Sequence, residues 1–526
     1  MEHTLIFGTA YAEPELAGNR TETDLEWLWE AGFNLICLTV CWERWEPENG
    51  AFDFTDFHRV LSGARSRGMK VILEIPSGAC PGWLLRKGVD AAPYQERFLG
   101  KLTEQCGAYG CIAGFRLGGD LQSPETLRLR KLLSGLETAL PFCRGDRYSG
   151  GSRTGMEISM EADTARGSGA EHFVMPRFPS GGRLGRLPYP GQLRLETWEC
   201  FAAGAGGVCY DGFYPDETGA RRGILSHDLS RGRIYRECAQ LGGELSRVGE
   251  RLSGMKKQNR IAIMVSRNSR RNALWPENSA MGYDDYLKWI YDGFYRLNLE
   301  VDMIPDTRRD FTGYALLVTP CLYSAEDNLI WAIRDYVAGG GNLIATFRSF
   351  FADENGRVRR DVQPYGMTDV FGMSYEEYTA PRATNLPEYG ADTAEWMELL
   401  SLSGARSMGT YGGTEWPGTP AVTCHKFGRG AAAYIGCYSP EGLKPILLRL
   451  LSAWHIPVPE ISWPVVMKRG TGRQGSTILY LLHYGSTPRV IPCPGAGREL
   501  LSGRLLEEGE PLELKPWDVK ILEGTL

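Results

Sequence analysis

The sequence lacks the clustered cysteines and histidines that metal sites and disulfide-rich domains need. Its 13 cysteines are scattered without a C-x-x-C pair, and its seven histidines are also dispersed. Zinc sites and disulfide frameworks both place cysteines at short, regular spacings. We therefore predict reduced thiols in a cytoplasmic protein, with no bound metal and no cofactor.

Membrane and nucleic-acid partners are disfavoured on similar grounds. No apolar run approaches the ~18 residues that a membrane-spanning helix needs. The start, M-E-H-T-L-I-F, has no basic segment before a long apolar core, so we expect no signal peptide. The formal net charge of -6 argues against binding to a nucleic acid.

The 526 residues suggest about three domains, at roughly 150 residues per domain. Short apolar runs alternate with helical stretches over residues 1–255, which is the pattern of an α/β protein. Eight candidate strands fit a (β/α)8 TIM barrel whose fifth to seventh units are trimmed. They are Leu5–Tyr11, Phe33–Cys41, Lys70–Pro76, Ile112–Leu117, Leu140–Cys143, Gly155–Met160, His172–Met175 and Gly207–Phe213.

Two further domains follow the predicted barrel. Residues 259–456 combine strands and amphipathic helices as in a doubly wound, flavodoxin-like or amidotransferase-like α/β domain. An amidotransferase would need a nucleophilic cysteine between glycines, and Cys321 in T-P-C-L-Y lacks them, so we interpret this domain as an assembly module. Residues 460–526 alternate apolar and polar residues between turns, which predicts a small antiparallel β-sandwich.

The stretch from Ile112 to Gln122, I-A-G-F-R-L-G-G-D-L-Q, predicts a barrel strand that breaks at two glycines before Asp120. A carboxylate just past the end of a barrel strand lies on the catalytic face. The glycines allow a sharp turn and close approach of a ligand. Alternatively, Asp120 is part of the start of the next helix, although Ser123-Pro124-Glu125 is a better N-terminal signal.

Several motifs together resemble one family. They are A-Y-A-E-P-E-L (10–16), W-E-R-W-E-P-E-N-G-A-F-D-F (42–54), V-I-L-E-I-P-S-G-A-C-P-G-W-L (71–84), P-G-Q-L-R-L-E-T-W-E-C-F-A-A-G-A (190–205), F-T-G-Y-A-L-L-V-T-P (311–320) and Y-V-A-G-G-G-N-L (336–343). In these motifs the chain resembles glycoside hydrolase family 42, β-galactosidases with a barrel, a trimerisation domain and a small β-domain. The resemblance implies a small oligosaccharide or glycoside as ligand and a homotrimer as the assembly.

The chain departs from the family where the catalytic glutamates are expected. The family's acid/base lies in a segment like G-F-Q-I-D-N-E, which here is G-F-R-L-G-G-D and ends in Asp120. The nucleophile follows a segment like F-x-V-M, and here Pro176 occupies its position. The arginine usual on the second strand is replaced by Cys37. Proline has no nucleophile, and a misplacement of roughly 1 Å costs about a hundredfold in rate, so the family's two-glutamate mechanism cannot operate at these positions.

Other residues are candidates for the missing roles. We predict Asp120 as the acid and Glu161, at the end of the strand predicted at 155–160, as its replacement partner. Aromatic rings stack on sugar faces, and polar groups at strand ends hold hydroxyls. On that basis the predicted substrate-binding residues are Tyr11, Trp42, Glu74, Trp83, Asp163, Tyr210 and Asp211. For each of these alone, packing or a structural charge is the alternative.

Two functional hypotheses remain open from the sequence. The first is a glycoside hydrolase acting on a small β-galactoside or related glycoside through a non-standard carboxylate pair. The second is a catalytically inactive family member that binds carbohydrate or serves as a scaffolding protein.

Overall fold

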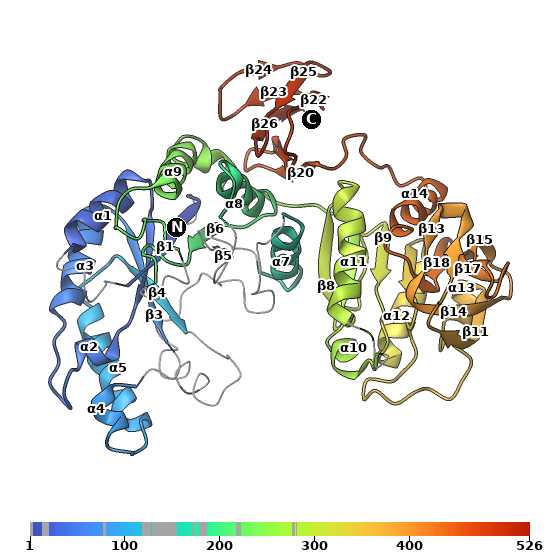
Figure 1. Cartoon of the computed structure of the whole chain (residues 1–526), viewed down its shortest axis with the longest axis horizontal. Helices are drawn as coiled ribbons and strands as arrows, with labels where there is room; N and C mark the ends of the chain where they lie inside the picture. Colours follow the sequence, from blue (N-terminus) through green and yellow to red (C-terminus); the bar gives the residue numbers. More distant parts are fainter. Residues whose placement is uncertain are drawn as a thin grey trace.

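Parallel strands form the sheet of the first domain, in the order β4-β3-β2-β1-β6-β5 (Figure 1). The computed structural model describes residues 4–12, 20–76, 80–117, 128, 155–170, 173–177, 187–216, 222–275, 279 and 281–525. Within these ranges the strands are β1 Ile6–Tyr11, β2 Leu35–Thr39, β3 Lys70–Ile75, β4 Ile112–Leu117, β5 Val174–Arg177 and β6 Gly207–Tyr210.

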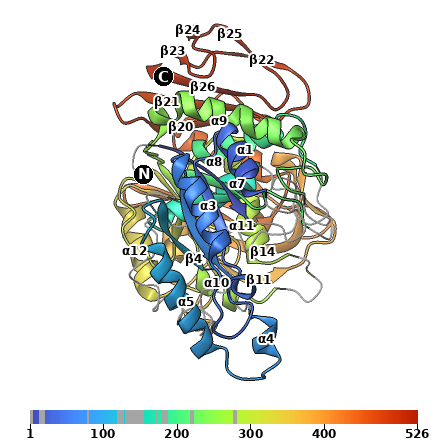
Figure 2. The same cartoon turned by 90° about the vertical axis from the view of Figure 1, so that its left-hand side faces the viewer.

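Helices α1 and α3 lie side by side along one side of this sheet (Figure 2). The helices of the domain are α1 Thr21–Glu30, α2 Trp42–Trp45, α3 Thr55–Ser66, α4 Gly82–Leu85, α5 Ala92–Cys106, α7 Gly155–Gly167, α8 Gln192–Ala202 and α9 Arg233–Leu252. In α3 the apolar residues Phe57, Val60, Leu61 and Ala64 recur at helical spacing and are all buried. The domain is a trimmed TIM barrel, as its alternating pattern predicted.

The predicted count of eight strands is wrong. Residues 155–160 form the first half of helix α7, not a strand, and residues 140–143 lie outside the described residues. Helix α7 packs against α8 on one side and against the second domain on the other. Because it is buried on several sides, its polar residues Ser159 and Asp163 are buried too, and the sequence shows no helical periodicity.

The second domain has a seven-stranded sheet, β15-β17-β18-β10-β9-β7-β8. Its strands are β7 Ile261–Val265, β8 Val301–Pro305, β9 Leu316–Thr319, β10 Asn342–Thr346, β15 Arg406–Thr410, β17 Pro420–Phe427 and β18 Gly430–Ile435. The strands from β18 to β8 run parallel, and β17 and β15 extend the sheet antiparallel. This is the doubly wound α/β fold that the sequence predicted.

The remaining elements of this domain are its helices and two small sheets. The helices are α10 Arg267–Asn272, α11 Tyr283–Arg296, α12 Asp327–Ala338, α13 Thr368–Phe371, the 3₁₀ turn η2 Pro387–Tyr389 and α14 Leu443–Ala453. The small sheets comprise β11 Met373–Thr379, β14 Ala394–Leu402 and β19 Cys437–Tyr438, and β12 Thr384–Leu386, β13 Ala391–Asp392 and β16 Gly412–Gly413.

The C-terminal domain consists of antiparallel strands in two sheets, β20-β21-β26-β23-β24 and β22-β25. Its strands are β20 Val465–Thr471, β21 Thr477–His483, β22 Arg489–Pro492, β23 Ala496–Glu499, β24 Leu505–Leu506, β25 Pro511–Leu514 and β26 Val519–Thr525. Alternate residues such as Leu479, Leu481 and Leu522 point into a separate apolar core. This confirms the predicted small β-domain. Among the described helices, none is both long and apolar enough to cross a bilayer.

One buried carboxylate, Glu199 on α8, joins the three domains. It accepts hydrogen bonds from Ser159 of α7, from Tyr295 of α11 at 3.3 Å and from Tyr484 of the C-terminal domain at 2.9 Å. Burial raises the pKa of Glu199, while the charge of Lys468 on β20 opposes the shift. The junction therefore depends on one residue that each domain contacts.

We predict that Glu199→Ala lowers the free energy of unfolding by about 3 kcal/mol, because it leaves several buried donors and Lys468 without their acceptor. Urea denaturation followed by tryptophan fluorescence measures this loss. Glu250→Ala, at an exposed position on α9, is the matched control. Equal midpoints for the two variants would contradict the assigned role of Glu199.

A second buried carboxylate, Glu398 on β14, makes stability depend on pH. Burial raises its pKa to about 7, against the backbone N–H of Arg348 and the hydroxyl of Tyr434, which donate to it at 2.8 Å. The folded pKa lies above the unfolded one, so stability is greatest below pH 4.5, the usual value for Glu, and falls as pH rises through 7.

Glu398→Gln should remove this contribution, because glutamine has no proton to lose. We expect the fall in unfolding free energy between pH 4.5 and 7.5 to be smaller in the variant than in the unsubstituted protein. Chemical denaturation at a series of pH values measures both slopes. Parallel slopes would show that Glu398 does not titrate in this range.

Candidate active site

The first sheet curls so strongly that β2 and β6, which flank β1, touch across its inner face. The sulfur atoms of Cys37 on β2 and Cys209 on β6 are 3.3 Å apart. Side chains alternate between the two faces of a strand, so residues two apart from these thiols also face the lumen. The curled sheet therefore has a concave inner face, which we call the lumen.

The floor of this lumen is apolar. Ile6, Leu35, Cys37, Ile72, Val174 and Cys209 form one buried cluster, against which Ala10 and Ala113 pack. Packing of this kind excludes water from the lower layers of the barrel. Among the described residues of the lumen, the charged groups therefore lie at its upper rim.

The mouth of the lumen is polar. Two residues beyond Cys37, Thr39 pairs in register with Glu74 on β3, and Glu74 pairs in register with Arg116 on β4. The Arg116 Nη1 atom lies 3.4 Å from the Glu74 Oε1 atom, and these side chains keep 31% and 21% of their exposure. Asp211 follows β6 two residues beyond Cys209 and is exposed. These groups lie at the carboxyl ends of the strands, the catalytic face of a barrel.

The environment of Glu74 favours its protonated form. Burial raises the pKa of this carboxyl, the nearby Arg116 guanidinium lowers it, and the negative charge of Asp211 raises it further. Asp211 after β6 thus lies near enough to Glu74 on β3 for its charge to act on that carboxyl, although β2 and β1 separate their strands in the sheet.

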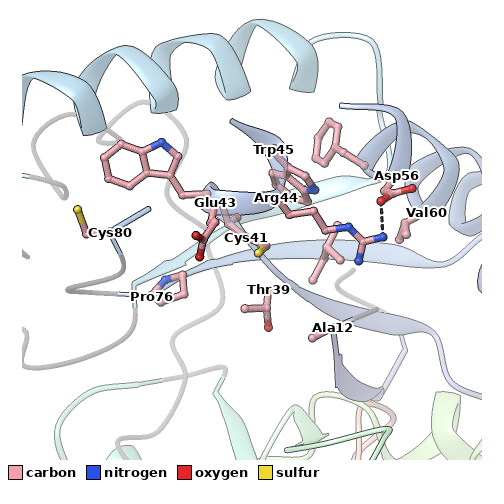
Figure 3. A pocket seen from close by; sticks show the side chains of 14 residues that line it. Ala12, Thr39, Cys41, Glu43, Arg44, Trp45, Asp56, Val60, Pro76 and Cys80 are labelled. Atoms are coloured by element: carbon pink, nitrogen blue, oxygen red, sulfur yellow. Dashed lines mark ion pairs between the residues drawn. The ribbon is translucent and has the colours of Figure 1, made fainter. Parts of the chain in front are cut away.

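A pocket of about 410 Å³ adjoins this mouth, between the ends of β1 to β3 and helices α2 and α3 (Figure 3). Thr39 and Cys41 line it, and Arg44 pairs with Asp56 at one end. Trp45 supplies an apolar wall. Its volume is in the range of small-molecule sites.

The predicted sugar platforms Trp42 and Trp83 are buried instead. Both indoles donate to Glu46, Trp42 to its carboxylate at 2.8 Å and Trp83 to its carbonyl oxygen at 2.8 Å. Glu46 is fully buried and also accepts from Gly50 N at 2.8 Å and from Arg97. The W-x-x-x-E-P motif thus fixes the loop after β2, and its tryptophans have a packing role.

Tyr11 and Tyr210 are fully buried and face the helices, not the lumen. They alternate with the inward-facing Ala10 and Cys209. The Tyr11 hydroxyl donates to Asp24 at 3.2 Å, and the Tyr210 hydroxyl lies 2.5 Å from that of Thr197. A sugar cannot stack on either ring in this structure.

Glu161 and Asp163 lie on helix α7, because the strand expected to carry them does not form. Asp163 accepts a hydrogen bond from Tyr291 of α11 at 2.5 Å and pairs with Arg166 at 2.8 Å. Arg166 also pairs with Asp302 of β8 at 2.9 Å. The structure therefore places Asp163 in the interface with the second domain, and it places Glu161 on the same buried helix.

Of the predicted site residues, the structure brings together Glu74 and Asp211. Asp120 lies outside the described residues. Arg116 was missed by sequence reasoning, although it lies in the strand that drew attention to Asp120. Only the pairing of β4 with β3 reveals that Arg116 faces Glu74. Among the described residues, no group of three or more His, Cys, Asp or Glu side chains could hold a metal ion.

Two family models together match most of the chain. A family model described as beta-galactosidase matches residues 11–102 and 135–248. A second, described as the beta-galactosidase trimerisation domain, matches residues 259–456.

Curated relatives carry the same description. Beta-galactosidase BgaB of Geobacillus sp. (strain Y412MC61) is 27% identical over 351 residues, which cover 63% of this chain and 51% of the relative. Beta-galactosidase LacZ of Heyndrickxia coagulans is 29% identical over 349 residues, covering 64% and 51%. The aligned part of the chain thus spans about half the length of the curated relatives it matches.

Solved structures share the fold. The crystal structure of beta-galactosidase from Bacillus circulans sp. alkalophilus superimposes with a TM-score of 0.86 at 19% identity, covering 99% of each chain. This likeness extends over all three domains and supports a TIM barrel followed by an α/β domain and a small β-domain.

Proposed function

The chain belongs to glycoside hydrolase family 42, and on that premise we propose that it hydrolyses a small β-galactoside or a related glycoside at the mouth of its barrel. The observation that carries this proposal is the polar layer at the mouth, where Glu74, Arg116 and Asp211 stand above an apolar floor.

Glycoside hydrolysis needs two carboxyl groups that flank the scissile bond, one of them protonated before the reaction. The mouth offers two carboxyls, Glu74 and Asp211, and the negative charge of Asp211 contributes to the raised pKa of Glu74. Burial raises the pKa of Glu74, and a raised pKa suits a general acid. The pocket beside the mouth provides room for part of a small substrate.

One observation favours an inactive carbohydrate-binding or scaffolding protein as the second candidate. Pro176 stands where the family's nucleophile is expected, on β5 in register with the lumen residue Cys209. A proline there offers no carboxylate, so activity requires a nucleophile from elsewhere in the barrel.

A panel of nitrophenyl glycosides tests the proposal. We expect nitrophenol release from the β-galactoside or a related glycoside to exceed the rate without protein. Isothermal titration of galactose runs in parallel. Binding of the sugar without turnover of any glycoside would establish the second candidate, and neither binding nor turnover would contradict both.

We also propose that the protein is a homotrimer assembled through residues 259–456. The match of these residues to the trimerisation domain of the family supports this assembly. Light scattering at micromolar concentration should give three times the mass of one chain. A monomer mass under these conditions would contradict the proposal.

A further inference from the structure

We propose that Glu74 and Asp211 are the catalytic carboxyl pair of this barrel, with Glu74 as the acid and Asp211 as the nucleophile, and that Arg116 positions Glu74. This inference rests on the proposed glycoside hydrolase function and names the residues that perform it. Neither residue occupies a position at which the sequence motifs predicted a catalytic group.

The layers of the lumen place the two carboxyls at one level. The contact of Cys37 with Cys209 at 3.3 Å fixes one layer of the interior. Two residues further along the same strands, Thr39 and Asp211 form the layer above. Glu74 is in register with Thr39 on the neighbouring strand. Glu74 and Asp211 therefore enter the mouth from different walls.

Charge coupling agrees with this geometry. Burial is the main cause of the raised pKa of Glu74, and the negative charge of Asp211 adds to it, although β1 and β2 lie between their strands. Such an effect requires the two carboxyls to lie near each other. A reacting bond held between them would be flanked by both carboxyls.

Arg116 is the third member of the site. Its guanidinium lies 3.4 Å from Glu74 and enters the lumen from β4. On β2, the residue one layer below is Cys37, whose thiol carries no comparable charge. A guanidinium presents donors in a rigid fork and so holds a carboxylate in one orientation. Arg116 thus fixes the Glu74 side chain and limits the rise of its pKa.

The chemistry proceeds by two displacements. In the first, an Asp211 oxygen attacks the anomeric carbon, the bond from that carbon to the leaving oxygen breaks, and Glu74 gives its proton to the leaving oxygen. In the second, water attacks the anomeric carbon, the ester bond to Asp211 breaks, and Glu74 takes one proton of the water. The free sugar leaves, and both carboxyl groups return to their starting forms.

The test measures kcat on nitrophenyl and dinitrophenyl galactosides for Glu74→Gln and Asp211→Asn, with Glu104→Gln as the control. Glu104 is an exposed carboxylate on α5, paired with Lys101 and remote from the lumen face. We expect each lumen variant to lose about 10²–10⁴-fold on the nitrophenyl substrate. The control should keep the unsubstituted rate.

Reaction with azide distinguishes the loss of a catalytic role from damage to the fold. Glu74→Gln should retain turnover of the dinitrophenyl substrate, whose leaving group needs no acid, and azide should give the β-galactosyl azide. Asp211→Asn should instead give the α-galactosyl azide, because azide then replaces the nucleophile on its own face. If the variants fail to fold, peptide mapping of unsubstituted protein treated with a 2-deoxy-2-fluoro-galactoside should find the label on Asp211.

The Arg116→Gln variant tests whether Arg116 acts on the Glu74 carboxyl or only stabilises the fold. Without the guanidinium, the pKa of Glu74 rises, so the acid stays protonated to higher pH. The basic limb of the kcat/KM profile should shift to higher pH in this variant. An unchanged limb together with a uniform loss of rate would show that Arg116 does not act on Glu74.

The outcomes distinguish this inference from the proposed function. If the unsubstituted protein turns over no glycoside, both fall. If the unsubstituted protein is active and Glu74→Gln and Asp211→Asn remain fully active, the pair assigned here is wrong. If Asp120→Asn or Glu161→Gln then loses activity, the pair predicted from the sequence is right.

Discussion

The three domains meet at one buried carboxylate, Glu199. Helix α8 carries it, and donors from α7, from the second domain and from the C-terminal domain converge on it. Burying a carboxylate is costly unless its oxygens are satisfied, so these donors must stay in place together. This network holds helix α7 between the barrel and β8. In the sequence, α7 stands where a full barrel would have further strands.

The trimmed barrel nevertheless keeps the separation of apolar and charged residues that a catalytic site needs. Its floor is an apolar cluster closed by two touching thiols, and its charges gather at the mouth. Burial raises the pKa of Glu74 at the edge of this floor, while the nearby Arg116 guanidinium opposes the rise. The same construction separates structural aromatic residues, such as Tyr11 and Tyr210, from the surface that a sugar can reach.

Local patterns predicted the parts of the chain whose environment matches their sequence. The strand Ile112–Leu117 was predicted to the residue, because its apolar run ends at two glycines. Helix α11 is one of the amphipathic helices predicted within residues 259–456, and its apolar residues are buried on one face. Helix α7 was mistaken for a strand because it is buried on several sides, which removes the polar face that marks a helix.

The sequence by itself determined the family and the fold class, because these depend on motifs, and it predicted that the usual glutamates are replaced by Asp120 and Pro176. It also identified Glu74 and Asp211 as residues at strand ends. Only the tertiary structure decided that these two share one lumen with Arg116, and that the predicted platforms are buried. The physical reason is that barrel curvature and strand register are set by contacts between distant strands, such as Cys37 with Cys209, which no local pattern records.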